Sequence, residues 1–121
     1  MTYTININDE DYEMKGYSFD IADKIADLKR NKYSTLRAKC KEHYAFICEV
    51  IGESIIKDNI GDFGSADPND IELVFNEAVH VYNKPIEDYE AKKAERRLQS
   101  VEKLMPAFEK MLKAENLVNK K

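Results

Sequence analysis

The sequence predicts a mainly α-helical fold with a short β-hairpin at its N-terminus. Only four of the 121 residues are glycine and three are proline, fewer than the frequent turns of an all-β fold need. Apolar residues recur at helical spacing over most of the chain, whereas the first residues alternate apolar and polar. We expect a single helical domain over 1–121, with a hairpin at 1–17, a helical core at 18–83 and a long C-terminal helix at 84–118.

The hairpin prediction depends on the stretch "TYTINI", residues 2–7. Tyr3, Ile5 and Ile7 share one face in this stretch, which is the period of a half-buried strand. The polar run "NDED" supplies turn residues, and Tyr12 and Met14 then resume the alternation. A two-stranded hairpin is not stable alone, so we expect it to pack on helices.

Two helices are expected to follow the hairpin. The first begins at a cap on Ser18 or Asp20 and ends near Asn31. The second starts after Ser34 and is long, because one apolar stripe runs through it without interruption. This stripe comprises Leu36, Cys40, Tyr44, Ile47, Ile51 and Ile55, with Gly52 inside the helix.

The stretch "IGDFGSADPND", residues 60–70, raises the question of a metal or phosphate site. No register in it supplies the ligand spacing of a calcium-binding EF-hand loop, and no lysine accompanies its glycines as in a phosphate loop. Asp67 and Pro68 are instead a preferred N-cap and first helical residue. We interpret this stretch as a connector that leads into a third helix.

The third helix is expected to end around Asn83, because the residue before a proline avoids helical backbone angles. Pro85 would then open a fourth, long helix, kinked near Pro106. Four or five helices are therefore expected. Residues 87–97 carry charges of alternating sign and few apolar side chains, so this part should face solvent or another subunit.

Candidates for catalysis or metal binding are few. Cys40 and His43 are three residues apart and could share a zinc ion, but Cys48 lies more than a turn beyond and His80 is on another helix. A buried cysteine beside a partly exposed histidine is the simpler interpretation. No serine-hydrolase, zinc-protease or P-loop motif occurs, so we expect no enzyme, no metal and no cofactor.

The net charge of −4 is unevenly distributed. An acidic cluster lies near the N-terminus, and six basic residues without an acid lie between residues 29 and 41. The basic run allows an alternative function, a small helix-turn-helix DNA-binding regulator with Arg37 near the bases. The acidic chain and the length of the second helix argue against it. A solvated helix corner, or a patch that meets the acidic hairpin of a neighbouring subunit, is favoured instead.

Residues 67–104, "DPNDIELVFNEAVHVYNKPIEDYEAKKAERRLQSVEKL", resemble small prophage proteins of Gram-positive bacteria that are encoded beside tail genes and are similar to tail assembly chaperones. The resemblance consists of an acidic helix start, "FNE", "YNKPI" and a charged long helix. It implies a non-enzymatic protein that keeps the tape-measure protein soluble during tail assembly and that self-associates.

The resemblance also implies a location in the bacterial host cytoplasm, and no apolar run suggests a membrane span or a secretion signal. Core packing is the competing interpretation for every contact residue, above all for Phe75 and Val79, whereas Tyr89 and Leu98 are the better candidates because their helix is polar. The expected protein-binding residues are Phe75, Val79, Tyr82, Ile86, Tyr89, Leu98 and Val101.

Overall fold

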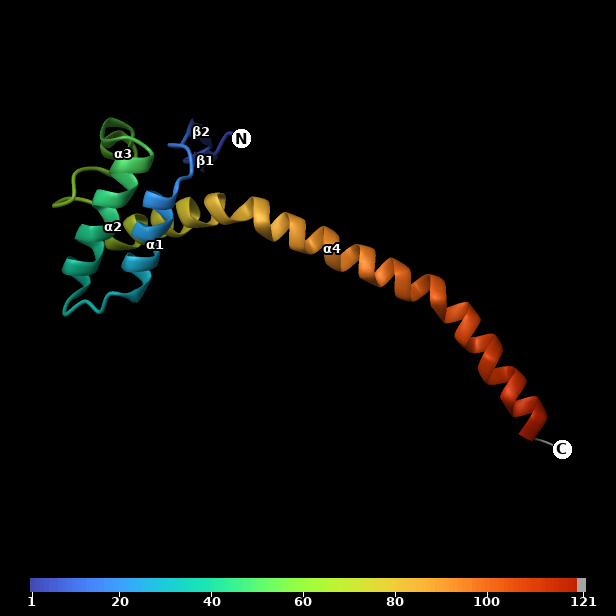
Figure 1. Cartoon of the computed structure of the whole chain (residues 1–121). Coiled ribbons are helices and arrows are strands. Elements are labelled where there is room, and N and C mark those ends of the chain that lie inside the picture. Colours follow the sequence, from blue (N-terminus) through green and yellow to red (C-terminus); the bar gives the residue numbers. More distant parts are fainter. Residues whose placement is uncertain (120–121) are drawn as a thin grey trace. The chain divides into compact units, whose positions relative to one another are not determined.

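The computed structural model describes the backbone of residues 1–119 and the side chains of residues 1–98 (Figure 1). It confirms a mainly helical fold with an N-terminal two-stranded hairpin followed, within these residues, by four helices. The chain divides into two compact units, Met1–Lys84 and Pro85–Lys121, and each is described by itself below.

The hairpin consists of β1 (Thr4–Ile7) and β2 (Glu10–Glu13), paired antiparallel. Asn8 and Asp9 connect them with positive φ angles of 52° and 68°, as a tight hairpin turn requires. Ile5 and Ile7 are buried against the helices. The Asn8 side chain donates to the Oδ1 of Asn59 at 3.2 Å, which fixes the turn to a later helix. The predicted hairpin is thus confirmed.

Side-chain caps set the starts of the first two helices. α1 (Phe19–Arg30) begins after Ser18, whose Oγ accepts a hydrogen bond from the backbone of Ile21 at 3.3 Å. α2 (Leu36–Val50) begins after Thr35, whose hydroxyl accepts from the backbone of Ala38 at 3.1 Å. The cap of α2 is therefore one residue later than the predicted Ser34. Asn31 ends α1, as predicted.

The single long helix predicted to run to Ile55 is wrong, because the structure divides it at Gly52. α2 ends at Val50 and α3 (Glu53–Ile60) follows. Gly52 has a φ of 127°, which L side chains rarely adopt and which no α-helix contains. The apolar stripe concealed this break, since Ile51 and Ile56 stay buried on either side of it.

α4 (Pro68–Asn119) begins as predicted from the connector 61–67. The Asp67 carboxylate accepts a hydrogen bond from the backbone of Asn69 at 2.8 Å. The predicted helix end at Asn83 is wrong, because α4 continues through Pro85. Proline removes the hydrogen bond to the carbonyl of Val81, but Val81 is only partly buried, so water can satisfy that carbonyl. The kink at Pro106 stays a prediction, as that side chain lies outside the described ones.

The core of Met1–Lys84 lies where the hairpin, the three shorter helices and the first turns of α4 meet. In Figure 1 the hairpin and α3 lie at one end of α2, and the α1–α2 connection lies at the other. A hydrogen bond of 2.8 Å from the Lys15 backbone to the Val50 carbonyl holds the hairpin at that end. The largest fully buried side chains of the core are Ile5, Ile21, Ile47, Ile56, Ile71 and Tyr82.

Candidate functional site

Three of the predicted protein-binding residues lie in the core. Phe75, Val79 and Tyr82 are 4%, 6% and 2% exposed and pack within Met1–Lys84. A side chain at this depth cannot meet a partner while the unit is folded. We therefore remove these three residues from the candidate surface, and the competing interpretation, core packing, holds for them.

Tyr82 has a specific structural role in that core. Its hydroxyl donates to the Lys15 carbonyl at 2.6 Å, and its ring stacks on Tyr17 with centroids 4.9 Å apart. Tyr3 packs against the same ring at 5.2 Å. Burial is the main cause that raises the pKa of the Tyr82 phenol to about 12. The residue thus connects α4 to the chain that leaves the hairpin.

Three other predicted residues are accessible. Ile86, Tyr89 and Leu98 are 64%, 61% and 63% exposed, and Phe19, Leu36 and Leu73 of the first unit are exposed to a comparable degree. Ile86 and Tyr89 are three residues apart on α4 and therefore lie on one side of the helix. Val101 lies beyond the described side chains.

The surroundings of these apolar residues are strongly charged. Every described side chain from Ile86 to Leu98 is exposed, and eight of these thirteen residues are acidic or basic. Such a helix has no core of its own within the segment, so its apolar side chains are available for another chain. We name the pair Ile86 and Tyr89 the exposed apolar face; Leu98, nine residues beyond Tyr89, lies on the opposite side of the helix.

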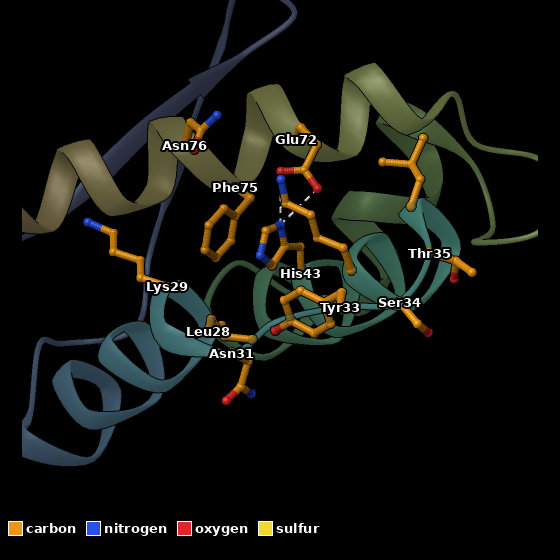
Figure 2. A pocket seen from close by; sticks show the side chains of 12 residues that line it. Leu28, Lys29, Asn31, Tyr33, Ser34, Thr35, His43, Glu72, Phe75 and Asn76 are labelled. Carbon is orange, nitrogen blue, oxygen red and sulfur yellow. Dashed lines mark hydrogen bonds and ion pairs between the residues drawn. The ribbon is translucent and has the colours of Figure 1, made fainter.

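A second candidate site surrounds His43, which the sequence indicates only as a candidate zinc ligand beside Cys40 (Figure 2). The ring is only 4% exposed and lies flat on Phe75, with centroids 3.7 Å apart and an interplanar angle of 7°. Its Nδ1 lies 2.8 and 2.9 Å from the two carboxylate oxygens of Glu72. The expectation of a partly exposed histidine is wrong, because α4 covers the ring with these two side chains.

The His43 ring lies at the wall of a cavity of about 560 Å³ between the α1–α2 connection and α4. Lys29 and Lys39 line this cavity together with several hydrogen-bonding side chains. The hydroxyl of Tyr33 is buried and has no hydrogen-bond partner among the described residues. The polar side chains of the lining are Asn31, Tyr33, Ser34, Thr35, His43, Glu72 and Asn76.

The arrangement holds one ring nitrogen of His43 and leaves the other, Nε2, without a described hydrogen bond. Since an ionised carboxylate only accepts, Nδ1 is the donor to Glu72. No hydroxyl or thiol of residues 1–98 is hydrogen-bonded to Nε2, so the pair does not activate a nucleophile here. The contacts of Nδ1 hold the ring in place, and the geometry does not prepare the ring for proton transfer.

The two cysteines are free thiols. Cys40 is buried and its Sγ lies 3.5 Å from a Glu72 oxygen. Burial, followed by this hydrogen bond, raises the pKa of the Cys40 thiol, and burial also raises the pKa of Cys48. A raised pKa disfavours the thiolate that zinc or a nucleophilic step requires. Over residues 1–98 no three His, Cys, Asp or Glu side chains are grouped to hold a metal ion.

Two groups of like charge stand out among the charged residues of Met1–Lys84. The basic patch surrounds the α1–α2 connection, and it comprises Lys29, Arg30, Lys32, Arg37, Lys39 and Lys41. The acidic hairpin comprises Asp9, Glu10, Asp11 and Glu13. All ten side chains are exposed, and none forms an ion pair with another described residue.

Comparison of this chain with known proteins finds no relative. No protein-family model, no curated protein and no solved structure matches this chain. In the part of the chain whose side chains are described, no helix combines the length and the apolar character that a membrane span needs.

Proposed function

We propose that this chain is a non-enzymatic assembly factor, similar to the tail assembly chaperones of Gram-positive phages and prophages, that binds the tape-measure protein in the host cytoplasm and self-associates. The observation that carries the proposal is the exposed apolar face. Ile86 and Tyr89 are each more than 60% exposed on a charged helix. The resemblance of residues 67–104 to that family supports the choice of partner.

The physical basis is complementarity between helices. A tape-measure chain is long and presents apolar helical faces, which aggregate unless another protein covers them. Apolar side chains at helical spacing can pack against such a face, and the surrounding charges keep the complex dispersed. The exposed apolar face supplies two such side chains, Ile86 and Tyr89, and the alternating charges of residues 87–97 surround them.

Co-expression with the tape-measure protein from the same locus tests this function. We expect the wild-type chain to raise the soluble fraction of the tape-measure protein and to co-purify with it. The double variant Ile86→Ser with Tyr89→Ser removes two of the apolar contacts and should reduce the captured amount at least tenfold. A matched control is Lys92→Ser with Lys93→Ser, which alters the same exposed segment without removing apolar area.

Two results would contradict the proposal. One is a tape-measure protein that stays insoluble and does not co-purify with the wild-type chain. The other is equal capture by the wild-type chain and the Ile86→Ser, Tyr89→Ser variant, because the exposed apolar face would then not be the binding surface.

A further inference from the structure

We propose that the acidic hairpin of one copy docks on the basic patch of a second copy, with its carboxylates at the cavity between Lys29 and Lys39. This inference names the contact through which the chain self-associates, and it rests only on the self-association part of the proposed function. It needs no tape-measure protein and is measured separately from it.

The basic patch is a surface whose cations lack ion-pair partners among the described residues. Its six cations lie within thirteen residues that contain no acid, and none has an ion-pair partner within 4 Å among the described residues. Lys29 and Lys39 come from different helices and face the same cavity. The lining also holds the carboxylate of Glu72, which is bound to His43. A carboxylate is the group that two ammonium groups bind, since it can take hydrogen bonds from both.

The acidic hairpin has the opposite chemistry. Asp11 and Glu13 stand opposite Asn6 and Thr4 on β1, on the face away from the buried Ile5 and Ile7. Neither Asp11 nor Glu13 has a cation within 4 Å among the described residues. The tight turn at Asn8 and Asp9 holds the strands rigidly, so little conformational entropy is lost when the hairpin docks.

The two surfaces cannot meet within one molecule. α2 separates them, since the hairpin packs at its C-terminal end and the basic patch surrounds its N-terminal end (Figure 1). The 15 residues of α2 span roughly 22 Å. A contact between two different surfaces that is made once per pair is heterologous, and each pair keeps a free hairpin at one end and a free patch at the other. Two copies that dock reciprocally about a two-fold axis close into a dimer, and a contact made once per pair continues into rings or filaments.

Charge reversal provides the test, with sedimentation velocity of the full chain as the readout. The hairpin variant is Asp11→Lys with Glu13→Lys, which leaves the turn residues in place. The patch variant is Lys29→Glu with Lys39→Glu. Each variant alone places like charges in the contact and should raise the dissociation constant at least tenfold. An equimolar mixture of the two variants pairs opposite charges again and should restore the wild-type assembly.

Matched controls reverse the same number of charges elsewhere. Asp88→Lys with Glu90→Lys and Lys92→Glu with Lys93→Glu lie on exposed positions of the Pro85–Leu98 segment and should leave assembly unchanged. Circular dichroism and a urea titration of each variant verify that it is folded. Raising the salt from about 50 to 500 mM should weaken the wild-type assembly, because the charges are exposed.

Three results would overturn the inference: a wild-type chain that is monomeric at low salt, assembly that both variants retain, or a mixture that fails to restore it. A gel shift with duplex DNA that the patch variant abolishes, while assembly is unchanged, would assign the patch to nucleic acid instead. The Ile86→Ser, Tyr89→Ser variant should still assemble. If the mixture of charge-reversed variants assembles but the wild-type chain does not capture the tape-measure protein, the proposed function is refuted and this inference is retained.

Discussion

His43 donates from Nδ1 to the carboxylate of Glu72, with the two oxygens 2.8 and 2.9 Å away, although the residues are 29 positions apart in the chain. The bond joins α2 to the first turns of α4, and the face of the same ring lies on Phe75. A hydrogen bond to a charged acceptor at a nearly buried site is among the stronger single interactions in a small protein. His43 is therefore a structural residue of the Met1–Lys84 core.

The His43–Glu72 contact predicts a measurable coupling energy. We expect His43→Ala to lower the free energy of unfolding by about 2–4 kcal/mol, because it leaves a void against Phe75 and removes the hydrogen bond. A double-mutant cycle with Glu72→Ala, measured by urea denaturation, should give a coupling of about 1–3 kcal/mol. Additive effects of the two substitutions would show that the contact does not contribute to stability.

Gly52 predicts a backbone effect. Gly52→Ala places a Cβ on a residue with a φ of 127° and should lower the free energy of unfolding by about 1–3 kcal/mol. Gly16→Ala is the matched control, since a Cβ there meets nothing within 4 Å and its φ is not in that region. Thermal unfolding of both variants compares them directly. If both lose the same stability, the division between α2 and α3 is not at Gly52.

Tyr82 predicts a loss of stability at alkaline pH. Its pKa is raised to about 12 in the folded chain, whereas an unfolded tyrosine ionises near pH 10. The folded state therefore binds the phenolic proton more tightly, and this contribution is fully present below about pH 10 and is lost as the pH rises to about 12. The unfolded state binds fewer protons in that window, so the free energy of unfolding falls there.

Tyr82→Phe tests this linkage. The variant lacks the hydrogen bond to the Lys15 carbonyl and should be about 1 kcal/mol less stable at neutral pH. The variant also has no phenol to ionise at this position. The difference in the free energy of unfolding between variant and wild-type chain should therefore narrow between pH 10 and 12 in urea titrations. A constant difference over that range would contradict the raised pKa.

Alanine substitutions of Phe75 and Tyr89 should differ in their effect on stability, because one side chain is in the core and the other is on the surface. Phe75→Ala should lower the free energy of unfolding by about 3–5 kcal/mol, because the ring is buried against His43 and Phe46. Tyr89→Ala, at a position that is 61% exposed, should change it by less than about 0.5 kcal/mol. Urea denaturation of the two variants gives both values. A large loss for Tyr89→Ala would indicate that this side chain is part of a core.

The sequence predicted those parts of the fold that local chemistry determines. The hairpin alternation, the Ser18 cap and the Asp67–Pro68 helix start each depend on a few neighbouring residues, and all three are confirmed. The breaks were harder to locate. The apolar stripe that continues past Gly52 predicts an unbroken helix, and Pro85 predicts a break although partly exposed backbone accommodates it.

The site was only partly predictable, because periodicity shows that a helix has an apolar face and not where that face leaves the core. Phe75, Val79, Tyr82, Ile86 and Tyr89 follow similar spacing, yet burial ends between Tyr82 and Ile86. The polar run after Glu87 was the signal, and Tyr89 is exposed there as that run predicts. The partners of His43 could not be predicted, since Glu72 and Phe75 reach it only through tertiary packing.

Hydrogen–deuterium exchange of the chain with and without the co-purified tape-measure protein tests the central claim most directly. If the exposed apolar face binds that protein, the backbone amides from Ile86 to Leu98 should exchange more slowly in the complex. The amides around the His43 cavity should be unchanged by the tape-measure protein at high salt, where the proposed self-assembly is weak. Protection confined to the cavity, with none from Ile86 to Leu98, would contradict the account.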